Sequence, residues 1–99
     1  MAQVVLTERA LRDLERLFEF LAERDPAYAA ARLASVRAAF AVLQDHPLLG
    51  RPAEDGRREL VLARGRDAYV AKYRWRPDDD VVLSLALRHA REAGFTEED

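Results

Sequence analysis

Residues 7–44 read TERALRDLERLFEFLAERDPAYAAARLASVRAAFAVLQ, and this stretch decides the fold. Apolar side chains recur in its first half at spacings of three and four residues, which predicts an amphipathic helix. We expect Thr7 to cap this helix at its N-terminus and the helix to run to about Arg24. The predicted apolar stripe consists of Leu11, Leu14, Phe18 and Leu21, widened by Leu17 and Phe20.

The second half of the stretch predicts another helix, which begins at Asp25 and Pro26 and ends near Gln44. Aspartate caps a helix well, and proline is tolerated at the first helical position. The predicted apolar face consists of Ala29, Leu33, Val36, Phe40 and Leu43. Almost no loop separates the two helices, so we expect them to fold back on each other as an antiparallel hairpin.

Four short segments outside the hairpin are predicted to be β-strands. They lie at Gln3–Leu6 and, after an irregular segment at 46–56, at 58–63, 68–75 and 81–87. Short turns join the last three strands, which should therefore pair antiparallel. The hairpin should cover one face of this sheet, because neither layer can bury its apolar side alone. The sequence thus predicts a single α+β domain over residues 1–99, in the order β-α-α-β-β-β.

The strand predicted over 68–75 presents two different sets of side chains, because successive residues of a strand point to opposite faces. The set expected to face the helices consists of Tyr69, Ala71, Tyr73 and Trp75. The set expected on the open face consists of Val70, Lys72 and Arg74. An alternative for the three aromatic rings is a stacking platform for nucleic-acid bases.

The composition excludes several classes of protein. The chain has 99 residues and no cysteine, which excludes a disulfide framework and a thiolate metal site. No apolar run approaches the roughly 20 residues that span a bilayer. The N-terminus lacks a basic start followed by a long apolar stretch, so we expect a cytoplasmic protein. We expect no metal and no cofactor.

The formal net charge of −2 conceals an uneven distribution. Residues 1–55 carry seven basic and nine acidic side chains, which gives −2. Residues 56–91 carry nine basic and five acidic side chains, which gives +4, and four acidic side chains follow within residues 92–99. The second half therefore contains a basic region that a partner can recognise, and an acidic tail that we expect to fray.

Five short motifs follow one another along the chain. They are Ala10–Leu14, then Leu43, Pro47, Gly50 and Arg51, then Arg58–Leu60, then Tyr69 and Tyr73, and finally Arg88–Arg91. In this order and at these distances they resemble the RelE/ParE family, the toxins of type II toxin–antitoxin systems, which include plasmid stabilisation proteins. The resemblance extends from about Val4 to Arg91.

This resemblance implies a helical hairpin on an antiparallel sheet, and a toxin that acts inside its own cell. It also implies a cognate antitoxin whose extended segment wraps over the toxin. Some members of the family cut mRNA on the ribosome. ParE-like members instead poison DNA gyrase and cleave no RNA.

Two positions favour the ParE-like activity. The family's RNases usually carry arginine at the position after the first strand tyrosine, where this chain has Val70, and a catalytic tyrosine near the C-terminus, where it has Phe95. Phenylalanine has no proton to give, and an isoelectric point near 5.7 is low for an RNase that binds the ribosome. The alternatives are an mRNA endoribonuclease that uses His89 with Arg88 and Arg91, and a non-toxic interaction module.

The marked residues also have structural interpretations. His89 is either a general acid or base, or a structural residue at a strand end. Gly50 and Arg51 either shape a functional loop or close a junction, with Gly50 in a backbone conformation that other residues resist. The candidates for target or partner binding are Arg51, Arg58, Arg64, Arg66, Lys72, Arg74 and Arg76. The alternative for Arg58 is a strand-edge arginine paired with an acidic neighbour, and the alternative for the last five is a solvated sheet surface.

Antitoxin binding is expected at a sheet edge or in the groove beside the hairpin, where a strand or helix of the partner can be added. A domain of this size buries a limited fraction of its surface. We therefore expect the chain to be unstable or poorly soluble without its partner.

Overall fold

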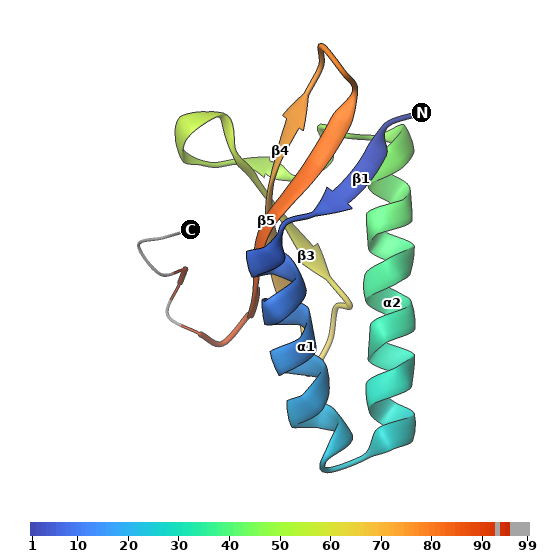
Figure 1. Cartoon of the computed structure of the whole chain (residues 1–99). Helices are drawn as coiled ribbons and strands as arrows, with labels where there is room; N and C mark the ends of the chain where they lie inside the picture. Colours follow the sequence, from blue (N-terminus) through green and yellow to red (C-terminus); the bar gives the residue numbers. More distant parts are fainter. Residues whose placement is uncertain (93, 96–99) are drawn as a thin grey trace.

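The computed structural model describes residues 1–92 and 94–95. Its elements are β1 (Gln3–Leu6), α1 (Glu8–Ala22), α2 (Pro26–Asp45), β2 (Arg51–Pro52), the 3-10 turn η1 (Glu54–Gly56), β3 (Arg58–Leu62), β4 (Tyr69–Arg76) and β5 (Val81–His89) (Figure 1). The predicted order of elements is confirmed, with β2 and η1 added inside the segment that was expected to be irregular. Most of the acidic tail, at position 93 and at 96–99, lies outside the described residues.

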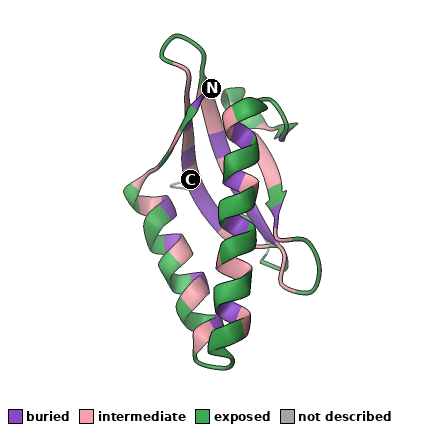
Figure 2. Cartoon of the chain, turned by 90° about the vertical axis from the view of Figure 1, so that its right-hand side faces the viewer, coloured by how far each residue is buried: buried purple, intermediate pink, exposed green. Residues whose placement is uncertain are grey.

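The sheet has five strands in the order β1-β5-β4-β3-β2. β1 runs parallel to β5, with Val4 opposite Val82, and the other neighbours are antiparallel. Figure 2 shows both helices on the same side of the sheet, with buried residues on the strands behind them. The fold is therefore two layers, a helical hairpin on a mostly antiparallel sheet, and among the described residues no helix covers the other face of the sheet.

Both helices begin at the predicted caps. The Thr7 hydroxyl accepts a hydrogen bond from the Ala10 N–H (3.1 Å), and it donates to the Leu85 carbonyl of β5 (3.1 Å). The Asp25 carboxylate accepts from the Tyr28 N–H (3.2 Å), with Pro26 as the first residue of α2. Each cap satisfies an N–H group that the first turn of a helix leaves unpaired. The Thr7 cap also ties α1 to β5.

The predicted buried face of α2 is confirmed, since Ala29, Val36, Phe40 and Leu43 are buried and Leu33 is half-buried. The predicted stripe of α1 is wrong in part. Leu11 and Phe20 are 47% and 52% exposed, and the fully buried positions are Ala10, Asp13, Leu17 and Leu21. The face is rotated toward Asp13 because that carboxylate accepts the buried Leu87 N–H of β5 (2.9 Å) and the Arg9 Nε–H (3.1 Å).

The predicted alternation of β4 is confirmed. Tyr69, Ala71 and Tyr73 are buried under the helices, Trp75 packs against the same core, and Lys72 lies on the other face. Opposite β4, the pairing shifts from Lys72 with Ala86 to Tyr73 with Ser84, so Leu85 is an extra residue in β5. Such a β-bulge changes which residues of the bulged strand face each side.

Within the described residues, no helix is long and apolar enough to cross a membrane.

Candidate functional site

The open face of the sheet brings cationic side chains from three strands together. The register sets Arg51 of β2 beside Glu59 of β3, Glu59 beside Lys72 of β4, and Val70 of β4 beside Arg88 of β5. A hollow of about 730 Å³ is lined by Arg51, Glu59, Lys72 and Arg88, and Phe95 also lines it. We call this the open-face hollow, lined by Arg51, Glu59, Lys72, Arg88 and Phe95.

The cations of the open-face hollow already have partners within the chain. Arg51 pairs with the Glu59 carboxylate (2.8 Å). The Phe95 ring lies between two cations, with its centroid 4.6 Å from Lys72 Nζ and 5.0 Å from Arg88 Cζ. Such cation–π contacts each contribute about 0.5–1 kcal/mol at exposed sites. The end of the chain therefore competes with any ligand for Lys72 and Arg88.

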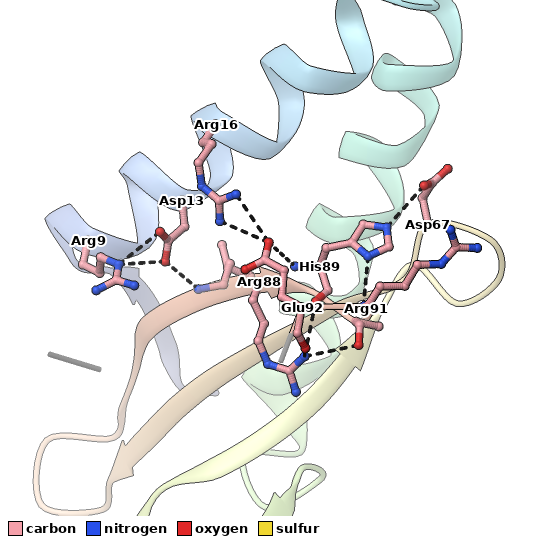
Figure 3. Close-up of polar contacts among 10 residues, drawn as sticks. Arg9, Asp13, Arg16, Asp67, Arg88, His89, Arg91 and Glu92 are labelled. Carbon is pink, nitrogen blue, oxygen red and sulfur yellow. Dashed lines mark hydrogen bonds and ion pairs between the residues drawn. The ribbon is translucent and has the colours of Figure 1, made fainter. Parts of the chain in front are cut away.

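Arg88 has further contacts to the backbone that follows it. Its Nη1 donates to the carbonyl oxygens of His89 (3.2 Å), Ala90 (3.3 Å) and Glu92 (3.1 Å), as Figure 3 shows in part. The guanidinium thus holds the chain that leaves β5 against the open face. These contacts engage the Nη1 end of the guanidinium.

His89 faces the helix side of the sheet, where both of its ring nitrogens have partners (Figure 3). Nδ1 accepts the Arg91 N–H (3.0 Å), so the ring proton lies on Nε2, 3.3 Å from Asp67 Oδ1. The ring also stands edge-on to Tyr69, with centroids 5.8 Å apart. These contacts support the structural interpretation of His89.

Asp67 links this histidine to the hairpin. Tyr28 of α2 donates its hydroxyl to Asp67 Oδ2, and this bond is the main cause that lowers the pKa of the Asp67 carboxyl, with a smaller effect from the His89 hydrogen bond. Arg32 of α2 donates to the carbonyls of Ala63 and Asp67 in the same turn. The β3–β4 turn is therefore fastened to α2 by side chains that the sequence analysis did not single out.

The three residues proposed for RNA cleavage do not converge. Arg88 and His89 are consecutive residues of one strand and point to opposite faces. Arg88 contacts Phe95 on the open face, whereas His89 contacts Asp67 on the helix side. Arg91 lines a hollow on the helix side with Phe20 of α1. Arg88 therefore lies on a different surface from His89 and Arg91, which line one hollow.

The predicted binding residues are spread over several surfaces. Arg74 lies on the open face and donates to the Asp55 carbonyl (2.7 Å), and Arg76 pairs with Asp79 at the β4–β5 turn. Arg64 and Arg66 are exposed in the β3–β4 turn. Arg57 lines the open-face hollow and was missed, although it lies within the basic region of the sequence. Of the seven candidates, the structure gathers Arg51, Lys72 and Arg74 on the open face.

Arg58 belongs to a structural junction on the helix side. Its Nη1 donates to the carbonyls of Gly50 (2.8 Å) and Leu48 (3.3 Å). Next to it, the buried Tyr73 hydroxyl donates to the Pro47 carbonyl (2.8 Å) and accepts the Gly50 N–H (2.8 Å). Burial is the main cause that raises the pKa of this hydroxyl.

Gly50 is required at the junction for a reason that differs from the prediction. Its backbone is not in the positive-φ region that other residues resist. A Cβ at this position would instead lie 2.7 Å from Tyr73 Cε1 and 2.8 Å from the Glu59 carbonyl oxygen. The motif formed by Pro47, Gly50, Arg58 and Tyr73 therefore closes the connection between α2 and the sheet.

A recess lies on the helix side between the two helices and β1. It measures about 310 Å³, and its apolar lining includes Leu6, Leu14, Val36 and Phe40. β1 is an edge strand, paired with β5 on one side only. We call this the hairpin recess. Within the described residues, no group of three or more His, Asp or Glu side chains is arranged to hold a metal ion.

A helical hairpin on one face of such a sheet, with a cationic face opposite, is the architecture of small toxins of the RelE/ParE type. Comparison with solved structures supports this class. The chain is similar to a structure of the chromosomal ParDE system from P. aeruginosa, with a TM-score of 0.74 and 22% identity over 90% of this chain and 96% of that one. It is also similar to a chain of the RelBE2 toxin–antitoxin complex from Mycobacterium tuberculosis, with a TM-score of 0.59 and 28% identity over 89% and 96%.

Residues 4–94 match the family described as the ParE toxin of the type II toxin–antitoxin system parDE. The chain belongs to this family. Among curated relatives, it is 35% identical to Toxin RelE3 of Caulobacter vibrioides, over 93% of this chain and 98% of the relative. It is 43% identical to Toxin RelE1 of the same organism, over 72% of this chain and 76% of the relative. The resemblance inferred from the five motifs is therefore confirmed.

Proposed function

We propose that this chain is a ParE-like toxin that inhibits growth by binding DNA gyrase, and that a cognate antitoxin neutralises it. The observation that carries the proposal is the separation of Arg88 and His89 onto opposite faces of the sheet. The gyrase target comes from the likeness to ParE-like toxins.

The chemistry of RNA cleavage supports this choice. Cleavage without a metal needs an acid and a base close to cations that stabilise the charge on the phosphate. The two central cations of the open-face hollow contact Phe95, which can neither accept nor donate a proton. The only nearby imidazole, among the described residues, lies on the other face with both nitrogens engaged. A toxin that binds its target without cleaving RNA does not need an acid, a base and cations at one site.

The hairpin recess and the free edge of β1 support an antitoxin that wraps over the toxin. An amphipathic helix can lay its apolar side chains against Leu14, Val36 and Phe40, and an extended segment can pair with an edge strand. The related M. tuberculosis structure is described as a toxin–antitoxin complex. We expect the antitoxin to cover the helix side of the molecule.

A supercoiling assay with purified gyrase tests the target. We expect near-equimolar toxin to inhibit supercoiling and added antitoxin to restore it. The variant His89→Ala should inhibit as the wild type does, because the proposed activity uses no general base. Full supercoiling in a large excess of folded toxin would remove gyrase as the target.

One observation favours a second candidate, a RelE-like endoribonuclease that acts on translated mRNA. Two relatives at 35% and 43% identity are named RelE toxins. Primer extension on translated mRNA after induction separates the two functions. Cleavage that is lost in Arg88→Ala or His89→Ala would establish the ribonuclease, and intact message during growth arrest would exclude it.

A further inference from the structure

A second hollow lies on the helix side, between the C-terminal half of α1 and the end of β5. It measures about 370 Å³, and its lining includes Arg16, Leu17, Phe20, Arg24, His89 and Arg91. Phe20 is 52% exposed, although it is a large aromatic side chain. Leu17 is buried behind it and continues the apolar wall. We call this the hairpin-tip hollow.

The rim of the hairpin-tip hollow carries guanidinium groups with unused charge. Arg24 lies over the Phe20 ring, with Cζ 4.5 Å from the centroid. Arg91 lies at the other side of the hollow, beyond His89. Among residues 1–92 and 94–95, neither Arg24 nor Arg91 forms an ion pair with a carboxylate. An aromatic surface bordered by such groups is the composition that protein interfaces enrich, because aromatic and arginine side chains dominate binding energy there.

We propose that the hairpin-tip hollow binds an acidic segment of a partner protein, with one apolar side chain against Phe20 and carboxylates on Arg24 and Arg91. The chain already places one carboxylate at this rim. Glu92 Oε1 lies 3.4 Å from Nη1 and Nη2 of Arg16, and it accepts the His89 backbone N–H (3.2 Å). Arg24 and Arg91 offer guanidinium donors of the same kind to a carboxylate of a partner. The proposal goes beyond the assignment of a target, since it holds whether the toxin acts on gyrase or on the ribosome.

The charge of the hollow favours a peptide over RNA. Three arginines face the carboxylates of Asp67 and Glu92, so the lining carries a net charge of only +1. Glu19 of α1 and Glu23, which follows that helix directly, are exposed, and the whole chain carries −2. RNA binding gains its affinity from the neutralisation of many consecutive phosphates, which this surface does not offer. Two spaced carboxylates and an apolar anchor match it better.

Fluorescence anisotropy with a defined probe tests the proposal. The probe is a short fluorescein-labelled peptide that alternates glutamate with leucine and contains one tryptophan, and the protein is the full chain made by cell-free synthesis. We expect saturable binding with a Kd on the order of 10 μM. Arg24→Glu and Phe20→Ala should each weaken binding by about tenfold, which corresponds to about 1.4 kcal/mol. Both side chains are exposed, so neither substitution removes a core contact.

Matched controls make the test specific. Arg12→Glu makes the same charge change on the exposed side of the same helix, outside the hollow, and should bind as the wild type does. A peptide with lysine in place of glutamate should not bind. The proposal is overturned if the acidic peptide shows no saturable binding, if Arg24→Glu binds as tightly as Arg12→Glu, or if oligouridine displaces the peptide at equal concentration. None of these outcomes depends on gyrase inhibition.

Discussion

The substitution Tyr73→Phe removes one oxygen from the junction between α2 and the sheet. That hydroxyl bridges the Pro47 carbonyl and the Gly50 N–H at 2.8 Å each, in a position with no solvent exposure. Leaving a buried N–H unpaired costs about 1–3 kcal/mol, and the second hydrogen bond contributes about 1 kcal/mol more. We expect a loss of about 2–4 kcal/mol in the free energy of unfolding. For a domain of this size each kcal/mol lowers Tm by about 4–8 °C, so Tm should fall by at least about 8 °C.

Urea unfolding of the full chain measures this loss. Trp75 is the chain's only tryptophan, and its Nε1 donates to Asp80 (2.9 Å) between β4 and β5, so its fluorescence reports on the sheet. The midpoint should fall while the slope m stays unchanged, which identifies a change in stability and not in the unfolded state. A loss below about 0.5 kcal/mol, the lower limit for a typical hydrogen bond, would refute the role assigned to the hydroxyl.

Gly50→Ala tests the same junction by changing the residue that packs against Tyr73. The new methyl group would meet Tyr73 Cε1 at 2.7 Å, and overpacking of this kind costs about 1–3 kcal/mol. The methyl group must displace the ring, so the hydrogen bonds of Tyr73 are already weakened in this variant. The variant that combines Gly50→Ala with Tyr73→Phe should therefore lose less free energy of unfolding than the sum of the two single losses, by at least about 0.5 kcal/mol. Additive losses would mean that Gly50 and Tyr73 act independently.

Three further perturbations follow from the contacts described above. The pKa of Asp67 is lowered in the folded state. The stability that this carboxylate contributes is therefore present above its ordinary pKa of 3.8 and is lost as the pH falls through the lowered pKa. We expect the Tm of Asp67→Asn to decline less steeply in acid than the Tm of the wild type. Asp13→Ala should cost about 3–5 kcal/mol in urea unfolding, because it leaves the buried Leu87 N–H without its acceptor and removes the ion pair with Arg9. Asp13→Asn should cost less, and equal losses would contradict this. Phe95→Ala removes the ring that contacts Lys72 and Arg88. We expect this substitution to tighten oligoribonucleotide binding by about three- to tenfold at low salt in a filter-binding assay. Unchanged affinity would show that the ring does not compete with RNA for these cations.

The helical hairpin was predictable because its signals are local. The caps at Thr7 and Asp25 are contacts within one turn, and the face of α2 follows from spacing alone. The face of α1 was predicted incorrectly in part, because Asp13 is buried by a contact with another layer, the Leu87 N–H. The sequence does carry one signal for it, since Asp13 stands in register with the buried positions Ala10, Leu17 and Leu21 at spacings of three and four.

The side of the sheet on which a residue lies was predictable only where the alternation within a single strand determines it. Alternation within β4 placed Lys72 and Arg74 on the open face correctly. Arg58 required the pairing of β3 with β4, which sets it opposite Tyr73 and thus on the helix side. Pairing depends on strand order and register, which hydrophobic periodicity does not specify. The same limitation applies to the hairpin-tip hollow, whose lining comes from α1, a turn and the end of β5.

The bulge in β5 has the largest consequence for function. Val82 and Ser84 face the helix side, and uninterrupted alternation would continue that face to Ala86 and Arg88. Because Leu85 is an extra residue, Leu87 and His89 take the helix side, and Arg88 moves to the open face beside Lys72 and Phe95. In an unbulged strand the imidazole would share the open face with Lys72, which is the arrangement that an RNase needs. One inserted residue thus removes the only strand histidine from the cationic face, and this is the physical reason for favouring binding over cleavage.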